Sequence, residues 1–314
     1  MILNKIPVIA VVGPTASGKT SLGIALAKRF GGEVVSADSM QIYRGMDIAT
    51  AKPTAQEQDG VVHHLIDFLD QREAFSVAEY AELAHRVIAD IHERGKLPII
   101  VGGTGLYVDS VLNDIVFTEI RTDAALREQL HAFAAEHGNA ALLARLKEVD
   151  PELAEKLHEN NLGRIVRALE VFELTGITMS EQQRRSCMKP SRYRVLKFGL
   201  NYDDRNVLYQ RIERRVDLMM EQGLLAEAET VLSSPMKTAV QAIGYKELAP
   251  YFSGEAELED CIAKLKLSTR HYAKRQLTWF LRDESTHWLY PDREEMPLLL
   301  ERAFLETEQF LSEE

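Results

Sequence analysis

The sequence has few of the features that mark a secreted or membrane-bound protein. It contains only two cysteines, Cys187 and Cys261, which stand far apart and lack metal-ligand spacing. This usage suits a reducing compartment and argues against a disulfide framework and a zinc site. No run of about 18 apolar residues occurs, and residues 1–12 lack the basic leader and the small-residue cleavage site of a signal peptide. We therefore expect a cytoplasmic protein that does not bind a membrane.

The chain is also short of positive charge, with 37 Lys and Arg against 48 Asp and Glu and a formal net charge of −11. Taken alone, this balance argues against a nucleic-acid partner, because phosphate binding relies on Lys and Arg. The charges are unevenly distributed, however. Acidic residues crowd the tail from residue 301 onward, whereas residues 264–282 contain none. Local charge decides binding, so the net charge excludes little.

Strand-like and helix-like patterns alternate through the first third of the chain. Strands are predicted at residues 7–12, 34–38 and 97–101, and helices at residues 21–30 and 76–95. The second helix is marked by a capping box formed by Ser76 and Glu79. This order predicts an α/β fold with a mostly parallel sheet.

The pattern changes after about residue 121. Ala-, Leu- and Glu-rich stretches with helical periodicity dominate residues 122–194, without a strand-like run before residue 195. We interpret this segment as an all-helical insertion. The expected core then comprises residues 1–121 and 195–314, with a strand at 195–201 and helices at 204–222, 259–282 and 295–311.

A phosphate-binding loop is predicted between the first strand and the first helix. The loop is Gly13-Pro14-Thr15-Ala16-Ser17-Gly18-Lys19-Thr20, in the strand-to-helix context that the P-loop motif requires. Its glycines let backbone N–H groups turn toward phosphate oxygens, Lys19 supplies a charge, and the Thr20 hydroxyl would hold Mg²⁺. A kinase or NTPase uses such a loop, and so does a transferase whose leaving group is diphosphate. The motif alone leaves both classes open.

Two further loops should meet the P-loop where parallel strands end. Asp38 follows the second strand, and its residue type fits a turn residue, a catalytic carboxylate or a Mg²⁺ ligand. Residues 102–107, Gly-Gly-Thr-Gly-Leu-Tyr, follow the third strand, and their glycines allow close backbone approach to a ligand. The spacing does not decide among these roles.

The helix predicted at residues 259–282 carries one sign of charge over most of its length. A solvated surface helix usually mixes both signs, so this pattern favours a phosphate-rich partner. Trp279 and Tyr272 flank the basic side chains as core residues or as platforms for an unstacked base. The basic residues are Lys264, Lys266, Arg270, Lys274, Arg275 and Arg282.

The motifs occur together, in this order, in one known family. With GPTASGKT at 13–20, DSMQIYRGMDIATAKP at 38–53, GGTGLY at 102–107, RIVRALE at 164–170, AIGYKE at 242–247 and RHYAKRQLTWF at 270–280, the chain resembles the bacterial tRNA dimethylallyltransferases. The resemblance spans nearly the whole chain. It implies a P-loop NTPase-like core, Mg²⁺ as cofactor, and a helical insertion that grips the anticodon stem-loop of tRNA.

The resemblance also implies a reaction and a set of site residues. A dimethylallyl group would pass from dimethylallyl diphosphate to N6 of adenosine 37 in tRNA, in a monomeric enzyme. Asp38 matches the general base, Lys19 and Thr104 match other catalytic positions, and residues 13–20 match the diphosphate cradle. Positions that match tRNA contacts are Asp38, Ser39, Met40, Gln41, Thr104, Arg127, Gly163, Arg164, Ile165, Val166, Arg167, Gln241, Ala242, Ile243, Gly244, Tyr245, Lys246, Lys274, Arg275, Gln276, Leu277, Thr278, Trp279, Phe280 and Leu281.

Two positions depart from the family pattern. Leu281 separates Trp279-Phe280 from Arg282, where Arg usually follows at once, and His158-Glu159-Asn160-Asn161 replaces a more usual His-Pro-Asn-Asp. Three other hypotheses stay open: a P-loop kinase of a small metabolite, a prenyltransferase acting on free adenine nucleotides, and a tRNA-binding chaperone with a relict P-loop. Neither the kinase nor the nucleotide prenyltransferase explains the basic helix.

Overall fold

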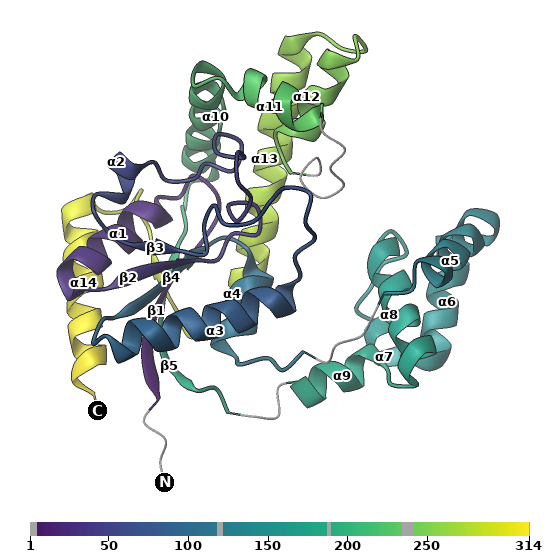
Figure 1. Cartoon of the computed structure of the whole chain (residues 1–314), viewed down its shortest axis with the longest axis horizontal. Helices are drawn as coiled ribbons and strands as arrows, with labels where there is room; N and C mark the ends of the chain where they lie inside the picture. Colours follow the sequence, from purple (N-terminus) through teal and green to yellow (C-terminus); the bar gives the residue numbers. More distant parts are fainter. Residues whose placement is uncertain (1–4, 118–121, 187–189, 234–241, 314) are drawn as a thin grey trace. The chain divides into compact units, whose positions relative to one another are not determined.

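The computed structural model describes residues 5–117, 122–186, 190–233 and 242–313. The chain divides into two compact units, one of residues 1–112 and 191–314 and one of residues 113–190. The larger unit holds a six-stranded sheet, and the smaller unit is helical where it is described (Figure 1). No helix among the described residues is both long and apolar enough to span a bilayer.

The sheet has the order β3-β2-β4-β1-β5-β6, and every paired strand is parallel. Its strands are β1 (Ile6–Val12), β2 (Glu33–Ser36), β3 (His63–His64), β4 (Pro98–Gly102), β5 (Tyr193–Leu200) and β6 (Thr286–Leu289). The predicted α/β class with a mostly parallel sheet is confirmed. Because the strands are parallel, the loops after β1, β2 and β4 all leave from one edge.

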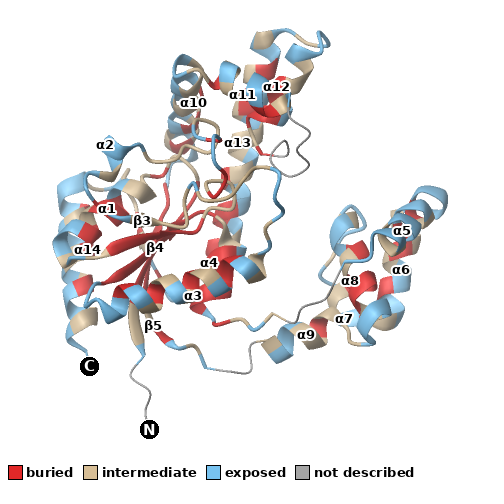
Figure 2. Cartoon of the chain, viewed as in Figure 1, coloured by how far each residue is buried: buried red, intermediate tan, exposed pale blue. Residues whose placement is uncertain are grey.

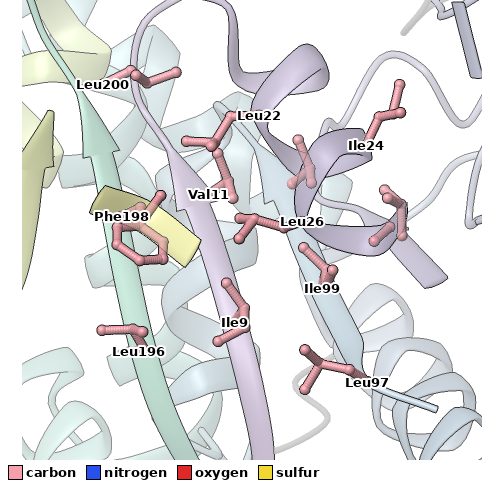
Figure 3. Packing of buried hydrophobic residues seen from close by; sticks show 14 of the residues in the cluster. Ile9, Val11, Leu22, Ile24, Leu26, Leu97, Ile99, Leu196, Phe198 and Leu200 are labelled. Carbon is pink, nitrogen blue, oxygen red and sulfur yellow. The ribbon is translucent and has the colours of Figure 1, made fainter. Parts of the chain in front are cut away.

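Helices cover both faces of this sheet. On one face, α1 (Lys19–Phe30) and α14 (Met296–Ser312) pack over side chains of β1, β4 and β5, among them Ile9, Ile99 and Phe198 (Figure 3). On the other, α3 (Val77–Glu93) and α4 (Gly105–Leu112) contact β2 and β4. β1 is therefore fully buried from Val8 to Val12, which explains its unbroken apolar run. The capping box of Ser76 and Glu79 at the start of α3 is confirmed.

A buried carboxylate fixes the amino end of β2. Glu33 accepts hydrogen bonds from both terminal nitrogens of Arg94 at 2.7 Å and from Lys96 at 2.6 Å, and it pairs with His64. The Arg94 guanidinium, together with Lys96 and His64, holds the pKa of Glu33 well below its usual range. Glu33 and Asp38 thus flank opposite ends of β2.

A second helical layer closes the loop edge of the sheet. It consists of α10 (Arg205–Glu221), α11 (Leu224–Leu232), α12 (Tyr245–Phe252) and α13 (Leu258–Phe280), with the short α2 (Ala55–Gln58) nearby in sequence to the loop after β2. Ile42, Tyr43 and Met46 from that loop pack into a buried cluster with Val216, Leu224 and Leu265. The buried residues in Figure 2 line the inner sides of these helices and the sheet.

The smaller unit is built from α5 (Ala124–His137), α6 (Asn139–Val149), α7 (Pro151–Ala154), α8 (Leu162–Thr175) and α9 (Met179–Ser186). Leu142, Leu146 and Ile165 form the centre of its own core. The observed boundaries differ from the predicted insertion of 122–194, because the unit spans 113–190 and β5 already begins at Tyr193. The charged Arg194 interrupts the apolar pattern at the start of this strand, so the sequence predicted a start at residue 195. In the structure, the Arg194 guanidinium packs over the ring of Phe310.

Candidate active site

The loop from Gly13 to Thr20 has the backbone of a phosphate cradle. Gly18 (φ 97°) precedes the first residue of α1 and makes no side-chain cap, so the first-turn N–H groups of the helix have no intrahelical acceptor. Gly13 (φ 142°) passes so close to β5 that a Cβ atom would lie 2.6 Å from the carbonyl oxygen of Leu200. Ala16 adopts a left-handed conformation at φ 62°, which is uncommon for a residue with a side chain.

Lys19 is half-buried within this cradle. Its Nζ donates to the carbonyl oxygen of Pro14 at 2.6 Å. Burial, and then the nearby charge of Arg215, lower the pKa of Lys19 to about 7, while Asp38 opposes this shift. Lys19 therefore loses its proton more readily than an exposed lysine does.

Two arginines of α10 reach the same loop, although they are not part of the P-loop motif. Arg215 donates from Nη1 to the hydroxyl of Thr15 at 3.3 Å, and Arg211 donates from Nε to the carbonyl of Ala16 at 2.9 Å. Burial lowers the pKa of Arg215. Their four-residue spacing on a helix was the available signal, but nothing in the sequence placed that helix beside the P-loop.

Gln276 connects α13 to two of the loops. Its Oε1 accepts from the backbone N–H of Thr15 at 2.8 Å, and its Nε2 donates to the carbonyl of Gly103 at 3.0 Å. The residue is 5% exposed. This tRNA-contact candidate therefore lies inside the protein, bound to the phosphate loop.

Asp38 follows β2 and lines the same cavity as Lys19. Its Oδ1 accepts from the N–H groups of Met40 at 2.9 Å and Gln41 at 3.4 Å, so the residue does organise a turn. Its Oδ2 makes no hydrogen bond with a described residue. One oxygen thus shapes the turn, and the carboxylate stays available to a ligand.

Thr104 and Gln41 hold the loops together. Thr104 Oγ1 accepts from the N–H of Ser39 at 3.1 Å and does not line the cavity. The Gln41 amide nitrogen donates to the carbonyls of Thr50 and Ala51, at 3.1 Å each, and its oxygen accepts from Ser36 Oγ at 3.2 Å. The side chains of both residues are therefore engaged within the protein.

The loops and helices enclose a cavity of about 310 Å³. Its polar lining includes Lys19, Thr20, Asp38, Arg215, Tyr272 and Arg275. Apolar side chains complete the wall, contributed mainly by α10, α11 and α13: Ile212, Val216, Met219, Leu224 and Leu265. The combination suits a ligand with a charged end and an apolar end.

The donor set suits a hard cation. Thr20 and Asp38 offer oxygen atoms in the cavity, and oxygen ligands are those that Mg²⁺ prefers, together with substrate phosphates and water. Among the described residues there is no group of three or more His, Cys, Asp or Glu side chains able to hold a metal. A Mg²⁺ ion would thus depend on a bound phosphate for most of its ligands.

Some of the basic side chains of α13 form ion pairs within the protein, which its sequence did not indicate. Lys266 pairs with Asp217 at 2.6 Å and Arg270 pairs with Glu213, so acidic side chains of α10 neutralise both. Lys274 and Arg275 are exposed, and the Arg275 guanidinium lies 5.7 Å from the ring centre of Tyr272. The ion pairs of Lys266 and Arg270 therefore interrupt the single-sign stripe, and Lys264 on one side and Lys274 and Arg275 on the other stay exposed.

The other candidates on α13 divide between the surface and the interior. Leu277 and Phe280 are buried, whereas Thr278 and Leu281 are exposed. Trp279 donates from its indole nitrogen to Asp109 at 2.7 Å. Leu281 ends the helix, yet Arg282 beyond it still lies 5.8 Å from the Trp279 ring. The cation that follows Leu281 thus lies beside the tryptophan.

The candidate tRNA contacts on α12 and the segment before it include one residue, Gln241, that lies outside the described residues. Ala242, Gly244 and Tyr245 are buried, Ile243 is half-buried and lines the cavity, and Lys246 is exposed and also lines it.

In the helical unit, a buried carboxylate organises two of the candidate tRNA contacts. Glu170 is fully buried and accepts from Arg127 through two bonds of 2.9 Å and from Arg167 at 2.6 Å. Burial raises the pKa of Glu170, but the hydrogen bonds from Arg127 and Arg167 outweigh it and keep the pKa below its usual value. Gly163 and Arg164 are exposed, while Ile165 and Val166 belong to the unit's core.

The Asn160-Asn161 departure has a local explanation. The side-chain oxygen of Asn161 accepts from the N–H of His158 at 2.9 Å, and the N–H of Asn160 donates to His158 Nδ1 at 3.2 Å. These bonds fix the turn that a proline ring would otherwise restrict.

Comparisons with known proteins agree on one family. The family model for IPP transferase matches residues 41–283. The chain is 48% identical to the tRNA dimethylallyltransferase of Caldanaerobacter subterraneus subsp. tengcongensis, over 91% of this chain and 92% of that protein. It is 50% identical to the tRNA dimethylallyltransferase of Halalkalibacterium halodurans, over 89% and 90%.

Solved structures show the same likeness. The full-length tRNA isopentenylpyrophosphate transferase of Bacillus halodurans matches with a TM-score of 0.73 and 45% identity, over 98% of this chain and 97% of that one. A eukaryotic dimethylallyltransferase described as acting on tRNA matches with a TM-score of 0.82 and 31% identity, over 98% and 80%.

Proposed function

Because this chain belongs to the IPP transferase family, we propose that it transfers a dimethylallyl group from dimethylallyl diphosphate to N6 of adenosine 37 in tRNA. One observation supports this reaction above all: Lys19, Asp38 and an apolar wall line a single cavity. A phosphate cradle serves the leaving group, a carboxylate serves the attacking amine, and the apolar side chains accommodate a hydrocarbon chain.

In the proposed reaction, the C–N bond forms as the allylic C–O bond breaks. The exocyclic amine of adenine is a poor nucleophile, because its lone pair is delocalised into the ring. Asp38 accepts the N6 proton as the bond forms, an effect of typically ~10²–10⁴-fold. The electron pair of the broken C–O bond leaves with the diphosphate.

The leaving diphosphate is stabilised by fixed charges and donors of this chain. Lys19, Arg215 and the first-turn N–H groups of α1 converge on the loop. Preorganised donors of this kind are worth about 3 kcal/mol each when they face developing charge. Mg²⁺, held by the Thr20 hydroxyl, would neutralise further charge on the diphosphate. The apolar side chains exclude water, which would otherwise capture the allylic carbon.

The tRNA would be held by cations of both units. Lys274 and Arg275 are exposed on the core, and Arg164 is exposed on the helical unit, which would grip the anticodon stem-loop. The half-buried Arg127 and Arg167, positioned by Glu170, would contribute there as well. Extracting one adenosine from its stack costs a few kcal/mol, and Ser39 and Met40 lie beside Asp38 to contact it. We propose that the enzyme acts as a cytoplasmic monomer.

Transfer of label from dimethylallyl diphosphate tests this function. The assay contains Mg²⁺, an unmodified anticodon stem-loop, and AMP and ATP as parallel acceptors. We expect label on the stem-loop alone. Label on AMP or ATP would indicate a prenyltransferase of free nucleotides, and the absence of label from every acceptor would contradict the proposal.

A further inference from the structure

We propose that Glu227 is a positioning residue for prenyl transfer, because it holds the turn at residues 47–49 and thereby fixes the segment that carries Asp38. The inference rests on the proposed function, in which Asp38 accepts the N6 proton. Glu227 lies on α11 and is not part of the cavity wall. Its action would therefore pass entirely through other residues.

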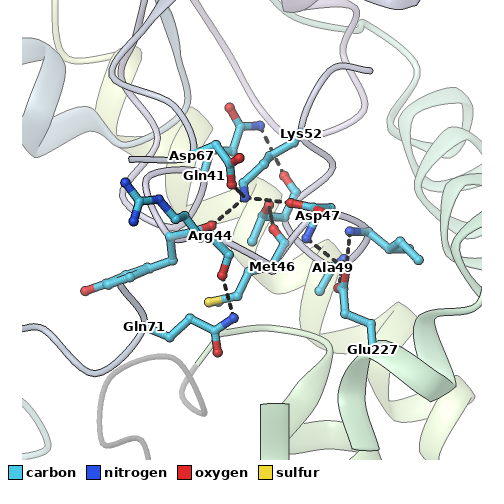
Figure 4. A network of polar contacts seen from close by, with 12 residues as sticks. Gln41, Arg44, Met46, Asp47, Ala49, Lys52, Asp67, Gln71 and Glu227 are labelled. Carbon is cyan, nitrogen blue, oxygen red and sulfur yellow. Dashed lines mark hydrogen bonds and ion pairs between the residues drawn. The ribbon is translucent and has the colours of Figure 1, made fainter. Parts of the chain in front are cut away.

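The Glu227 carboxylate is saturated by hydrogen bonds from one turn and one side chain. Its Oε2 accepts from the N–H groups of Asp47 and Ile48, each at 2.8 Å. Its Oε1 accepts from the N–H of Ala49 and the hydroxyl of Tyr245, each at 2.9 Å. Figure 4 shows the side chain reaching from its helix to the turn. A carboxylate has about four acceptor positions, so all of them are in use.

The turn passes this constraint to Asp38. Thr50 and Ala51 directly follow Ala49, and their carbonyls accept from the side chain of Gln41 at 3.1 Å each. The backbone N–H of Gln41, with that of Met40, donates to Asp38 Oδ1. Hydrogen bonds, linked by the backbone of residues 47–51 and by Gln41 itself, therefore join Glu227 to the proposed general base, which gives the coupling a physical route.

Two features show that contacts from outside residues 47–51 hold the conformation of this segment. Ala51 is held at φ 49°, a conformation that a non-glycine residue keeps only where its surroundings enforce it. Lys52 anchors the far side of the turn, where its Nζ donates to the carbonyl of Tyr43 and pairs with Asp47 and Asp67 at 2.6 Å each. Ala49, Thr50 and Ala51 also line the cavity, so a shift of the turn changes the site directly.

The uncharged analogue cannot replace the carboxylate. In a Glu227→Gln variant, the amide nitrogen would face at least one backbone N–H of the turn, so a donor would meet a donor. Misplacement of a catalytic group by about 1 Å costs up to ~100-fold in rate. We therefore expect the rate of the chemical step to fall, while Lys19 and Arg215, which belong to other segments of the chain, keep their places.

The test compares Glu227→Gln with two control variants of the full-length protein. Glu229→Gln changes an exposed carboxylate of the same helix, and Glu33→Gln removes a buried carboxylate at the far end of β2. Each protein is assayed for its single-turnover transfer rate at saturating tRNA stem-loop and dimethylallyl diphosphate, for its Kd for inorganic pyrophosphate, and for its Tm.

We expect Glu227→Gln to lower the single-turnover rate by about 10- to 100-fold and to leave the pyrophosphate Kd within about threefold of the wild type. Glu229→Gln should match the wild type. Glu33→Gln should lower the Tm without lowering the rate. A Glu227→Gln rate within threefold of the wild type would overturn the inference, as would equal losses of rate in Glu227→Gln and Glu33→Gln.

If Glu227→Gln does not fold, Tyr245→Phe carries the test, because it removes one of the four hydrogen bonds and retains the backbone contacts. Its rate should fall about threefold, and an unchanged rate would overturn the inference. Absence of transfer by the wild-type protein would instead contradict the proposed function, so the two failures remain distinguishable.

Discussion

The side chain of Gln276 accepts a hydrogen bond from the backbone N–H of Thr15 across 2.8 Å, although the two residues stand 261 positions apart. The same amide donates to Gly103, so one side chain of α13 fixes the loops after β1 and β4. The Thr15 N–H is therefore unavailable to a phosphate, and the cradle depends on the remaining donors of the loop.

Replacing Gln276 with Leu should weaken binding of the diphosphate more than binding of tRNA. The leucine leaves the partly buried Thr15 N–H without its present partner, at a cost of up to about 1–3 kcal/mol, and releases the loop. We expect the Kd for inorganic pyrophosphate, measured by calorimetry, to rise about tenfold. Glu259→Gln, an exposed change in the first turn of the same helix, is the control. A larger loss for tRNA than for pyrophosphate would instead make Gln276 a tRNA contact.

Binding of diphosphate should be linked to proton uptake at Lys19. Burial and then Arg215 lower the pKa of this ammonium group to about 7 in the free protein, and a bound anion raises it again. Above that pKa the free lysine loses its proton and the bound one keeps it, so affinity should fall as the pH rises through 7. Calorimetry of pyrophosphate binding in buffers of different ionisation enthalpy measures the protons taken up. The Lys19→Met variant should lack this component, and equal uptake in both proteins would contradict the prediction.

Asp38→Asn should separate chemistry from binding. The amide oxygen can still accept from the N–H groups of Met40 and Gln41, so the turn is retained, but the base is lost. We expect turnover to fall by ~10²–10⁴-fold while the Kd for the stem-loop stays within a few fold. An equal loss of turnover and of tRNA affinity would assign Asp38 a structural role.

Glu170→Gln should destabilise the helical unit. It breaks a buried pairing with Arg127 and Arg167, a change that typically costs about 3–5 kcal/mol. Because the pKa of Glu170 is lowered in the folded state, its contribution is present above the unfolded pKa and is lost as the pH falls through the folded pKa. Hydrogen exchange of α5 and α8 in the full-length protein measures the change. The more exposed Glu173→Gln on the same helix should leave exchange unaltered, and equal protection in all three proteins would refute the prediction.

Two lysines of α13 should differ in their effect on tRNA binding. Lys274 is exposed, whereas Lys266 is paired with Asp217. Lys274→Gln should reduce the slope of log K against log salt concentration by about one contact, and Lys266→Gln should reduce it less. Filter-binding titrations over a range of salt concentrations provide the slopes. Identical slopes for the two variants would show that the ion pair with Asp217 does not keep Lys266 from contacting tRNA.

Local sequence patterns predicted the phosphate loop and much of the fold. The P-loop motif, with strand and helix on its flanks, predicted residues 13–20, and the alternation of elements predicted the parallel sheet. The rule that loops gather where parallel strands end correctly brought Asp38 to the cavity beside Lys19.

The features that the sequence did not predict are contacts between residues far apart in the chain. Arg215, Gln276 and Glu227 act on loops about 180 to 260 positions away in the sequence, and helical periodicity does not specify which side chain meets which loop. The neutralisation of Lys266 and Arg270 was hidden for the same reason, because their partners lie on another helix.

The tie between Gln276 and the phosphate loop also bears on how the protein is made. Synthesis runs from the amino terminus, so the ribosome completes the P-loop and Asp38 long before it adds α13. A nascent chain that ends before residue 276 carries both reactive groups but lacks the residue that sets the loop. We expect such chains to be inert toward prenyl diphosphate, so the order of translation itself would delay catalysis until the protein is almost finished.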